Sequence, residues 1–143
     1  MKAKNTKVIF DTNVWISFLI GKRLSFIRHY ISSGEITIVT TEQLLEEIKE
    51  VTGRERLKKY FPQQSVVELL QLLETIAEKV EIVPIHFISR DAKDNFLLDL
   101  IDFSKADYLV TGDKDLLVHN PFKSATILTP ANFEKILTEL QKP

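Results

Sequence analysis

Short apolar runs alternate along the chain with longer segments in which apolar residues recur every three or four positions. The short runs are typical of strands buried on both faces, and the longer segments have the period of amphipathic helices. The pattern predicts five strands, over residues 7–10, 35–40, 80–85, 107–112 and 124–129. It predicts helices over residues 14–31 with an interruption near Gly21, 42–51, 66–79, 92–104 and 131–141, and a further helical turn in the basic stretch 54–61.

Capping residues mark where several of these helices begin. Thr41, Ser65 and Asp91 can each cap the helix that follows, and Pro130 is suited to open the last helix. No glycine-, serine- or proline-rich linker and no internal repeat divides the chain, so we expect residues 1–143 to form one domain. Because strands alternate with helices, we expect an α/β fold, with a mostly parallel sheet of about five strands covered on both faces.

Acidic residues stand where two of the predicted strands end. Asp11 follows the first strand, and Asp113 follows the fourth. Ligands of parallel α/β sheets bind outside the carboxyl ends of the strands, where these two acids are expected. On the predicted helix 42–51, Glu47 lies at the border of the apolar stripe, whereas its neighbour Glu46 points away from it. Only this difference in helix face favours Glu47 over Glu46 as a site residue.

Asp94 has the most informative position of all the acids. It precedes Leu97, Leu98 and Ile101 by three, four and seven residues, so it shares the core-facing side of its helix. A buried carboxylate without a partner is costly, which favours a bound cation. The alternative is an acid stabilised by the start of the helix, with Asp91 as the cap. The two interpretations are compatible, because the helix can begin at the strand ends.

Each remaining acid also has an ordinary structural interpretation. Asp11 and Asp113 can be turn residues, and Asp115 can either bind metal or cap a short helix. Four acids expected at one edge of one sheet nevertheless favour a metal site. Four neutral residues near the strand ends can orient the carboxylates, or can serve only in turns and caps: Thr12, Asn13, Thr41 and Thr111.

The composition narrows the choice of metal. The chain has no cysteine, and its three histidines lack the spacing of zinc ligands. The expected ion is therefore hard and oxygen-bound, Mg²⁺ or Mn²⁺. Such an ion lowers the pKa of a bound water and neutralises charge that develops on phosphate oxygens. The acids therefore point to phosphodiester chemistry.

Charge and hydropathy bear on partners and location. The net charge is −1, so any contact with nucleic acid must come from a local patch. Residues 49–60 contain five basic and two acidic side chains. Arg54, Arg56, Lys58 and Lys59 are the candidates for binding nucleic acid. The alternative is a solvated connector. No apolar run approaches the length of a membrane span, and the first residues lead directly into a strand, so we expect a cytoplasmic protein without membrane contact.

Several segments together resemble the PIN domain family. They are FDTNVWIS (10–17), TTEQLLEEIKEV (40–51), SRDAKDNFLLDLIDFSKADYLVTGDKDLL (89–117) and TILTPANF (126–133). The resemblance covers nearly the whole chain, and it is strongest to the small prokaryotic branch that contains toxins of toxin–antitoxin systems. It implies a Rossmann-like α/β/α sandwich and a Mg²⁺- or Mn²⁺-dependent ribonuclease.

The resemblance also assigns roles to individual residues. Asp11, Glu47, Asp94 and Asp113 match the four family acids that bind metal and catalyse hydrolysis, and the fourth position is the least uniform in the family. Thr12 and Asn13 match the polar pair after the first acid, and Thr111 matches the polar position before the last. The resemblance further implies an RNA substrate and an antitoxin partner, although PIN domains also serve in RNA processing.

Three further expectations remain open. The apolar residues of 14–20 exceed one helix stripe, so Trp15 can belong to the core, to a homodimer interface or to a groove for a partner peptide. The alternative to a nuclease with this fold is a non-catalytic module that binds RNA or protein. A third class, an α/β phosphotransfer domain, also uses strand-end aspartates. A receiver would need an acidic pair before Asp11, and a phosphatase would need an aspartate where Asn13 stands.

Overall fold

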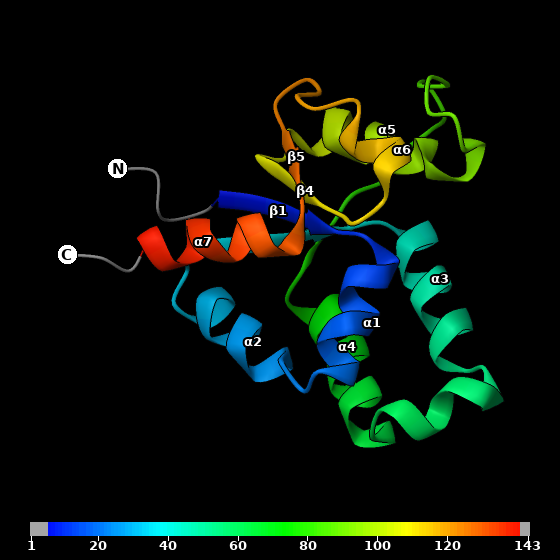
Figure 1. Ribbon diagram of the computed structural model, residues 1–143, viewed down its shortest axis with the longest axis vertical. Helices are drawn as coiled ribbons and strands as arrows, with labels where there is room; N and C mark the ends of the chain where they lie inside the picture. The colour runs from blue at the N-terminus through cyan, green and yellow to red at the C-terminus, as the bar shows by residue number, and fades with distance from the viewer. Residues whose placement is uncertain (1–5, 141–143) are drawn as a thin grey trace.

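Five parallel strands form the centre of the computed structural model, which describes residues 6–140 (Figure 1). The order across the sheet is β3-β2-β1-β4-β5. This confirms the expected α/β fold. The strands are β1 (Thr6–Phe10), β2 (Ile36–Thr40), β3 (Glu78–Lys79), β4 (Tyr108–Val110) and β5 (Thr126–Leu128).

Helices cover both faces of the sheet. In Figure 1, α5 and α6 lie on one side of the strands, and α1, α2, α4 and α7 lie on the other. Helix α3 packs beside α1, near the end toward which β1 runs. The helices are α1 (Thr12–Ile20), α2 (Leu24–Ser32), α3 (Glu42–Thr52), α4 (Gln63–Thr75), α5 (Asn95–Ser104), α6 (Lys114–Leu117) and α7 (Pro130–Leu140), with 3₁₀ turns η1 (Glu55–Tyr60) and η2 (Ala92–Asp94).

A cluster of aromatic rings joins β1 to the helices below the sheet. Phe10 is fully buried, and its ring meets those of Trp15, Phe18 and Phe133 edge to face, with centroids 4.9, 5.3 and 5.6 Å away. Edge-to-face contacts add to the burial of such large side chains. Trp15 is fully buried as well, so it belongs to the core. The cluster fixes the end of β1, where Asp11 begins α1.

Most of the predicted elements are present with small shifts at their ends. The helix predicted over 14–31 is interrupted after Ile20 and resumes at Leu24, and Lys22 between them has a φ of 57°. Asp91 caps the turn η2 with a 3.1 Å bond from the Lys93 amide, and Pro130 opens α7. Residue 141, the predicted end of the last helix, lies outside the described residues.

The prediction of a strand over residues 80–85 is wrong, and so are the predicted bounds of the helix before it. Helix α4 begins after Pro62 and ends at Thr75, and only Glu78–Lys79 pairs with β2. Residues 80–88 have no regular structure. Two of their amides instead donate to a side chain: Ile85 and His86 bond the Asp99 Oδ1 atom at 3.1 and 2.9 Å. Helix α5 therefore holds this segment in place of a neighbouring strand.

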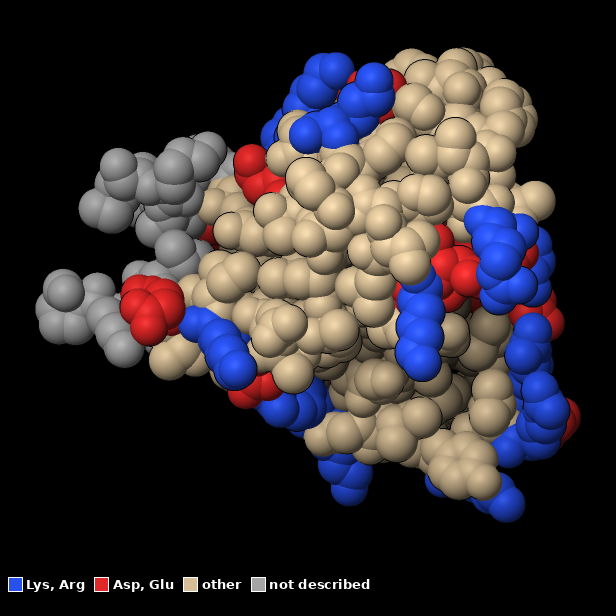
Figure 2. Space-filling model, turned by 45° about the horizontal axis from the view of Figure 1, so that its top comes forward, with Lys and Arg blue, Asp and Glu red and all other residues tan. Residues whose placement is uncertain are grey.

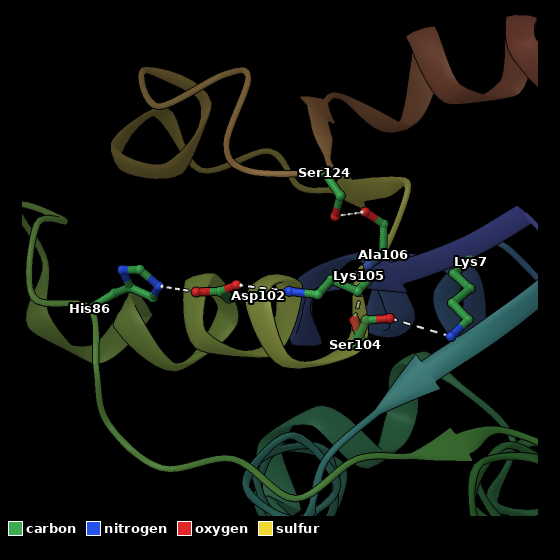
Figure 3. A network of polar contacts seen from close by, with 7 residues as sticks. All are labelled: Lys7, His86, Asp102, Ser104, Lys105, Ala106 and Ser124. Carbon is green, nitrogen blue, oxygen red and sulfur yellow. Dashed lines mark hydrogen bonds and ion pairs between the residues drawn. The ribbon is translucent and has the colours of Figure 1, made fainter.

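A second set of polar contacts holds the same segment and the residues near the amino ends of the strands (Figure 3). The His86 Nε2 atom lies 2.9 Å from Asp102 Oδ2, and that contact lowers the pKa of Asp102. Nearby, the Ser124 hydroxyl donates to the Ala106 carbonyl at 2.6 Å, and Lys7 Nζ donates to the Ser104 carbonyl at 3.3 Å. These contacts anchor the end of α5 that lies away from the predicted acids.

Within the described residues, no helix is both long enough and apolar enough to cross a membrane.

The aromatic cluster predicts a large loss of stability when Phe10 is truncated. Phe10→Ala removes three ring contacts from a fully buried site, so we expect the free energy of unfolding to fall by about 3–5 kcal/mol. Urea unfolding, followed by Trp15 fluorescence, measures this change. Phe87→Ala is the matched control: Phe87 is 72% exposed, and its truncation should change stability by no more than about 0.5 kcal/mol. Equal losses in both variants would contradict the assigned core.

Candidate functional site

The carboxyl ends of β1 and β4 bring Asp11 and Thr111 together. Phe10 pairs with Val110, and the next residues on the two strands are Asp11 and Thr111. The Thr111 hydroxyl donates to Asp11 Oδ2, and the Val14 amide donates to Asp11 Oδ1 at 2.9 Å. Asp11 is only 7% exposed, and burial raises its pKa, although these two hydrogen bonds lower it. The carboxylate is therefore held in one orientation at the start of α1.

Glu47 reaches the same edge from α3. Its Oε1 atom accepts a 2.8 Å hydrogen bond from the Thr12 hydroxyl, which immediately follows Asp11. Glu47 is half-buried, whereas Glu46 is exposed. This arrangement agrees with the helix-face argument that favoured Glu47. Thr12 links the second predicted acid to the residue beside the first.

Asp94 and Asp113 form a coupled pair of carboxyl groups. The pKa of Asp94 is raised to about 7, first by burial and then by the contact with Asp113 and by the charges of Asp113, Asp91 and Asp11. The pKa of Asp113 is lowered, first by its hydrogen bond with Asp94. A proton shared by the pair therefore resides on Asp94. Asp113 also caps α6, accepting from the Asp115 amide at 2.9 Å.

Three acids approach one another closely enough to hold a metal ion. One carboxylate oxygen from each of Asp91, Asp94 and Asp115 lies within 4.8 Å of the others. Asp94 is thus common to this group and to the four acids predicted from the sequence. Among the described residues, Asp11, Glu47 and Asp113 are not members of this closest group. Asp113 contacts Asp94, the charge of Asp11 acts on Asp94, and Glu47 bonds Thr12 beside Asp11.

The donors at this edge fit a hard divalent cation. The ligand atoms are carboxylate oxygens, which Mg²⁺ and Mn²⁺ prefer. The Oδ2 atom of Asp94 is buried and has no hydrogen-bond partner among the described residues. A buried carboxylate oxygen without a partner is unfavourable, and a cation would satisfy it. Asp91, Asp94 and Asp115 could hold such an ion, with Asp11 and Asp113 beside it.

The neutral residues predicted to orient the acids differ in their contacts. Thr111 and Thr12 each donate to a carboxylate, and the Thr111 hydroxyl also accepts from the Asp113 amide at 3.0 Å. The Asn13 residue is exposed. Thr41 is buried at the start of α3, yet its side chain makes no capping hydrogen bond. The structure thus brings two of these four residues to the acids by direct contact.

The basic candidates lie on the surface at η1 and just before it. Arg54 pairs with Glu50 at 2.7 Å, and Lys58 pairs with Glu55 at 3.0 Å. Arg56 is exposed, and the Lys59 ammonium lies 5.3 Å from the ring centre of its neighbour Tyr60. Figure 2 shows acidic side chains at the right margin of the molecule with lysine and arginine side chains on both sides of them.

Two residues at the site have roles that the sequence analysis missed. Asp91 was interpreted only as a cap, but as the residue that caps η2 it also brings a carboxylate oxygen within 4.8 Å of oxygens of Asp94 and Asp115. Arg90 forms a two-pronged ion pair with Asp115, at 2.8 and 3.1 Å, beside the closest acids. The spacing of the two aspartates in RDAKD could have indicated Asp91, whereas no sequence pattern indicates the contact of Arg90.

A comparison with protein-family models independently supports the interpretation of these acids as a functional site. The model of the PIN domain matches residues 7–115, which include every acid described above. No curated protein and no solved structure matches the chain. PIN domains are generally nucleases that use divalent metal ions, and the acidic group found here could bind one. Because the match spans well over half of the sequence, the chain belongs to the PIN domain family.

Proposed function

We propose that the protein is an endoribonuclease that depends on Mg²⁺ or Mn²⁺. The observation that carries the proposal is the buried, unpartnered oxygen of Asp94 among carboxylates that could share a cation. Family membership supports nuclease chemistry for this arrangement. The choice of RNA over DNA and of these two metals belongs to the proposal, and the sequence resemblance supports both choices.

The side chains at the site would have different roles. Asp91, Asp94 and Asp115 would hold the ion, with Asp11 and Asp113 next to it. When bound, a divalent ion lowers the pKa of water and stabilises charge on a phosphate undergoing hydrolysis. Thr111 and the Val14 amide orient Asp11 before any ion binds. Thr12 holds Oε1 of Glu47 and leaves its other oxygen to accept a hydrogen bond from water.

The negatively charged phosphate backbone of an RNA substrate would need basic side chains nearby, because the acidic residues repel it. Arg54 and Lys58 are paired with glutamates, but exposed ion pairs contribute little and phosphate can replace the carboxylate. We therefore propose that Arg54, Arg56, Lys58 and Lys59 contact RNA phosphates away from the scissile bond. Cation binding at the acid group would reduce the local repulsion of phosphate.

We further propose that the nuclease is the toxin of a toxin–antitoxin pair. The resemblance of the DTN segment and of the segment ending in TGDKDLL to small prokaryotic PIN proteins supports this role. The partner would be an antitoxin protein that blocks the acidic edge. The homodimer expected from the sequence stays a prediction.

RNA cleavage should depend on metal and on the half-buried acids. With Mn²⁺ and single-stranded RNA, Asp94→Asn and Glu47→Gln should each slow cleavage by at least about 100-fold, because each removes a charge at the site. Glu46→Gln is the matched control and should cleave like the wild type, since Glu46 points to solvent. Gel analysis of labelled RNA with Mn²⁺ or EDTA measures the rates. Equal cleavage by wild type and Asp94→Asn would refute the assignment.

The raised pKa of Asp94 predicts how stability depends on pH and metal. A carboxyl whose pKa rises from 3.8 to about 7 on folding stabilises the fold fully below pH 3.8, and this contribution is lost as pH rises through about 7. Without metal, Asp94→Asn should therefore match the wild-type Tm below about pH 3.8, exceed it increasingly as the pH rises toward 7, and exceed it by a few degrees at pH 8.

Excess Mn²⁺ should reverse that order at pH 8. The ion binds the folded wild type and raises its Tm, whereas the variant has lost a ligand. Differential scanning fluorimetry with EDTA or Mn²⁺ measures both effects. A variant that melts below the wild type in EDTA at pH 8, or gains as much from Mn²⁺, would contradict the role of Asp94.

Toxicity can be tested apart from cleavage. Induced expression in a bacterial host should stop growth within a few generations, and Asp94→Asn expressed at the same level should not. Colony counts and growth curves measure the effect, with immunoblots to match expression. Unimpaired growth with a wild-type protein that cleaves RNA in vitro would favour a role in RNA processing over a toxin.

A further inference from the structure

A hollow of about 650 Å³ lies on the carboxyl edge of the sheet, beyond Asp11. Val8 pairs with Ile38 in parallel register, so Asp11 stands level with Thr41 on the neighbouring strand. Neighbouring strands are about 4.8 Å apart, so the hollow begins one strand from the buried acid. It is lined by Thr41, Glu42, Gln43, Lys79, Val80, Glu81 and Ile82.

Helix α3 lines the hollow and also carries Glu47 of the acidic site. Gln43 lines the hollow, and Glu47 lies four residues further along the same helix. Side chains at this spacing are neighbours on one helix face. Glu47 is in turn tied to Thr12 beside Asp11. A strand of RNA with one phosphate at the acids can therefore place an adjacent nucleotide in the hollow.

Three polar side chains of the hollow are free to bind a ligand. Within the described part of the chain, the side chains of Glu81 and Gln43 form no hydrogen bond or ion pair with another residue. Thr41 is only 3% exposed, and its hydroxyl does not cap α3. By contrast, Glu42 and Lys79 form an ion pair at 2.7 Å, which leaves little net charge from that pair. Glu81 thus gives the hollow a negative character.

We propose that this hollow is a subsite for a nucleobase that carries an exocyclic amino group; the inference rests on the proposed ribonuclease function. A carboxylate disfavours the phosphate but accepts from the amino group of a base, as glutamate does from cytosine N4. The half-buried Val80 and Ile82 offer apolar contacts for the base. Uracil has a carbonyl oxygen at the position of the cytosine amino group, and Glu81 would repel it.

The sharpest test compares cytosine with uracil, because the two bases are similar in size. Fluorescence anisotropy with Ca²⁺ should show that the wild-type protein binds a ten-nucleotide oligocytidine about tenfold more tightly than the matching oligouridine. Glu81→Ala should bring that ratio close to one, and Gln43→Ala should reduce it. Glu68→Ala is the control: it removes the same charge from an exposed site in a different hollow, and should leave the ratio unchanged.

The outcomes separate this inference from the proposed function. A ratio near one in the wild type, or a ratio unaffected by Glu81→Ala, would overturn the subsite even if Mn²⁺-dependent cleavage is observed. A ratio that Glu81→Ala abolishes would support the subsite, even if no RNA is cleaved and the nuclease proposal fails. Cleavage of the same oligonucleotides with Mn²⁺ is therefore run in parallel.

Discussion

Repulsion among carboxylates is the constraint on which the functional edge of this protein depends. Asp11, Asp94 and Asp113 lie close enough for their charges to alter one another's pKa. Like charges at this proximity oppose folding unless protons, hydrogen bonds or cations compensate. The fold supplies the first two: a proton on Asp94, and donors from Thr111 and the Val14 amide to Asp11. The remaining compensation is what a divalent cation would provide.

The packing beneath the acids makes this arrangement possible. Phe10 immediately precedes Asp11, and its fully buried ring is enclosed by three other aromatic rings. Further along α5, Asp99 and Asp102 hold segment 80–88 through amide and histidine contacts. Helix α5 is thus held by contacts along its length, and Asp94 caps its beginning. A rigid scaffold can hold repelling groups together because movement of any one of them would disrupt the core.

The parts of the fold that could be predicted from the sequence are those that produce a local periodic pattern of apolar residues. The apolar runs identified β1, β2, β4 and β5, and the position of Asp94 relative to Leu97, Leu98 and Ile101 placed that acid on an inward face. Segment 80–85 has the composition of a strand, but Asp99, fourteen residues beyond Ile85, takes up two of its amides. Asp99 competes with a neighbouring strand for these amides, and no local sequence pattern reveals such a long-range contact.

The same distinction separates the acids that the sequence identified from those it did not. Asp91 has extended backbone just before η2, so the direction of its side chain does not follow from a helical period. Arg90, before η2, meets Asp115 of α6 across 25 residues of sequence. Sequence reasoning finds an acid that violates the pattern of its own helix, but not one whose position is set by a second element.

The order of side chains along the carboxyl ends of the strands relates the proposed metal site to the proposed base subsite. From β4 to β3, the edge presents Thr111, then Asp11, then Thr41, and finally the free carboxylate of Glu81. Under the proposed function, the groups near β4 and β1 would bind a cation, and those near β2 and β3 would accept from the donor groups of a base. A phosphate is unfavourable at both places without a cation. Under the proposed function, the substrate backbone would therefore enter where the cation binds, and the adjacent base would lie toward β3.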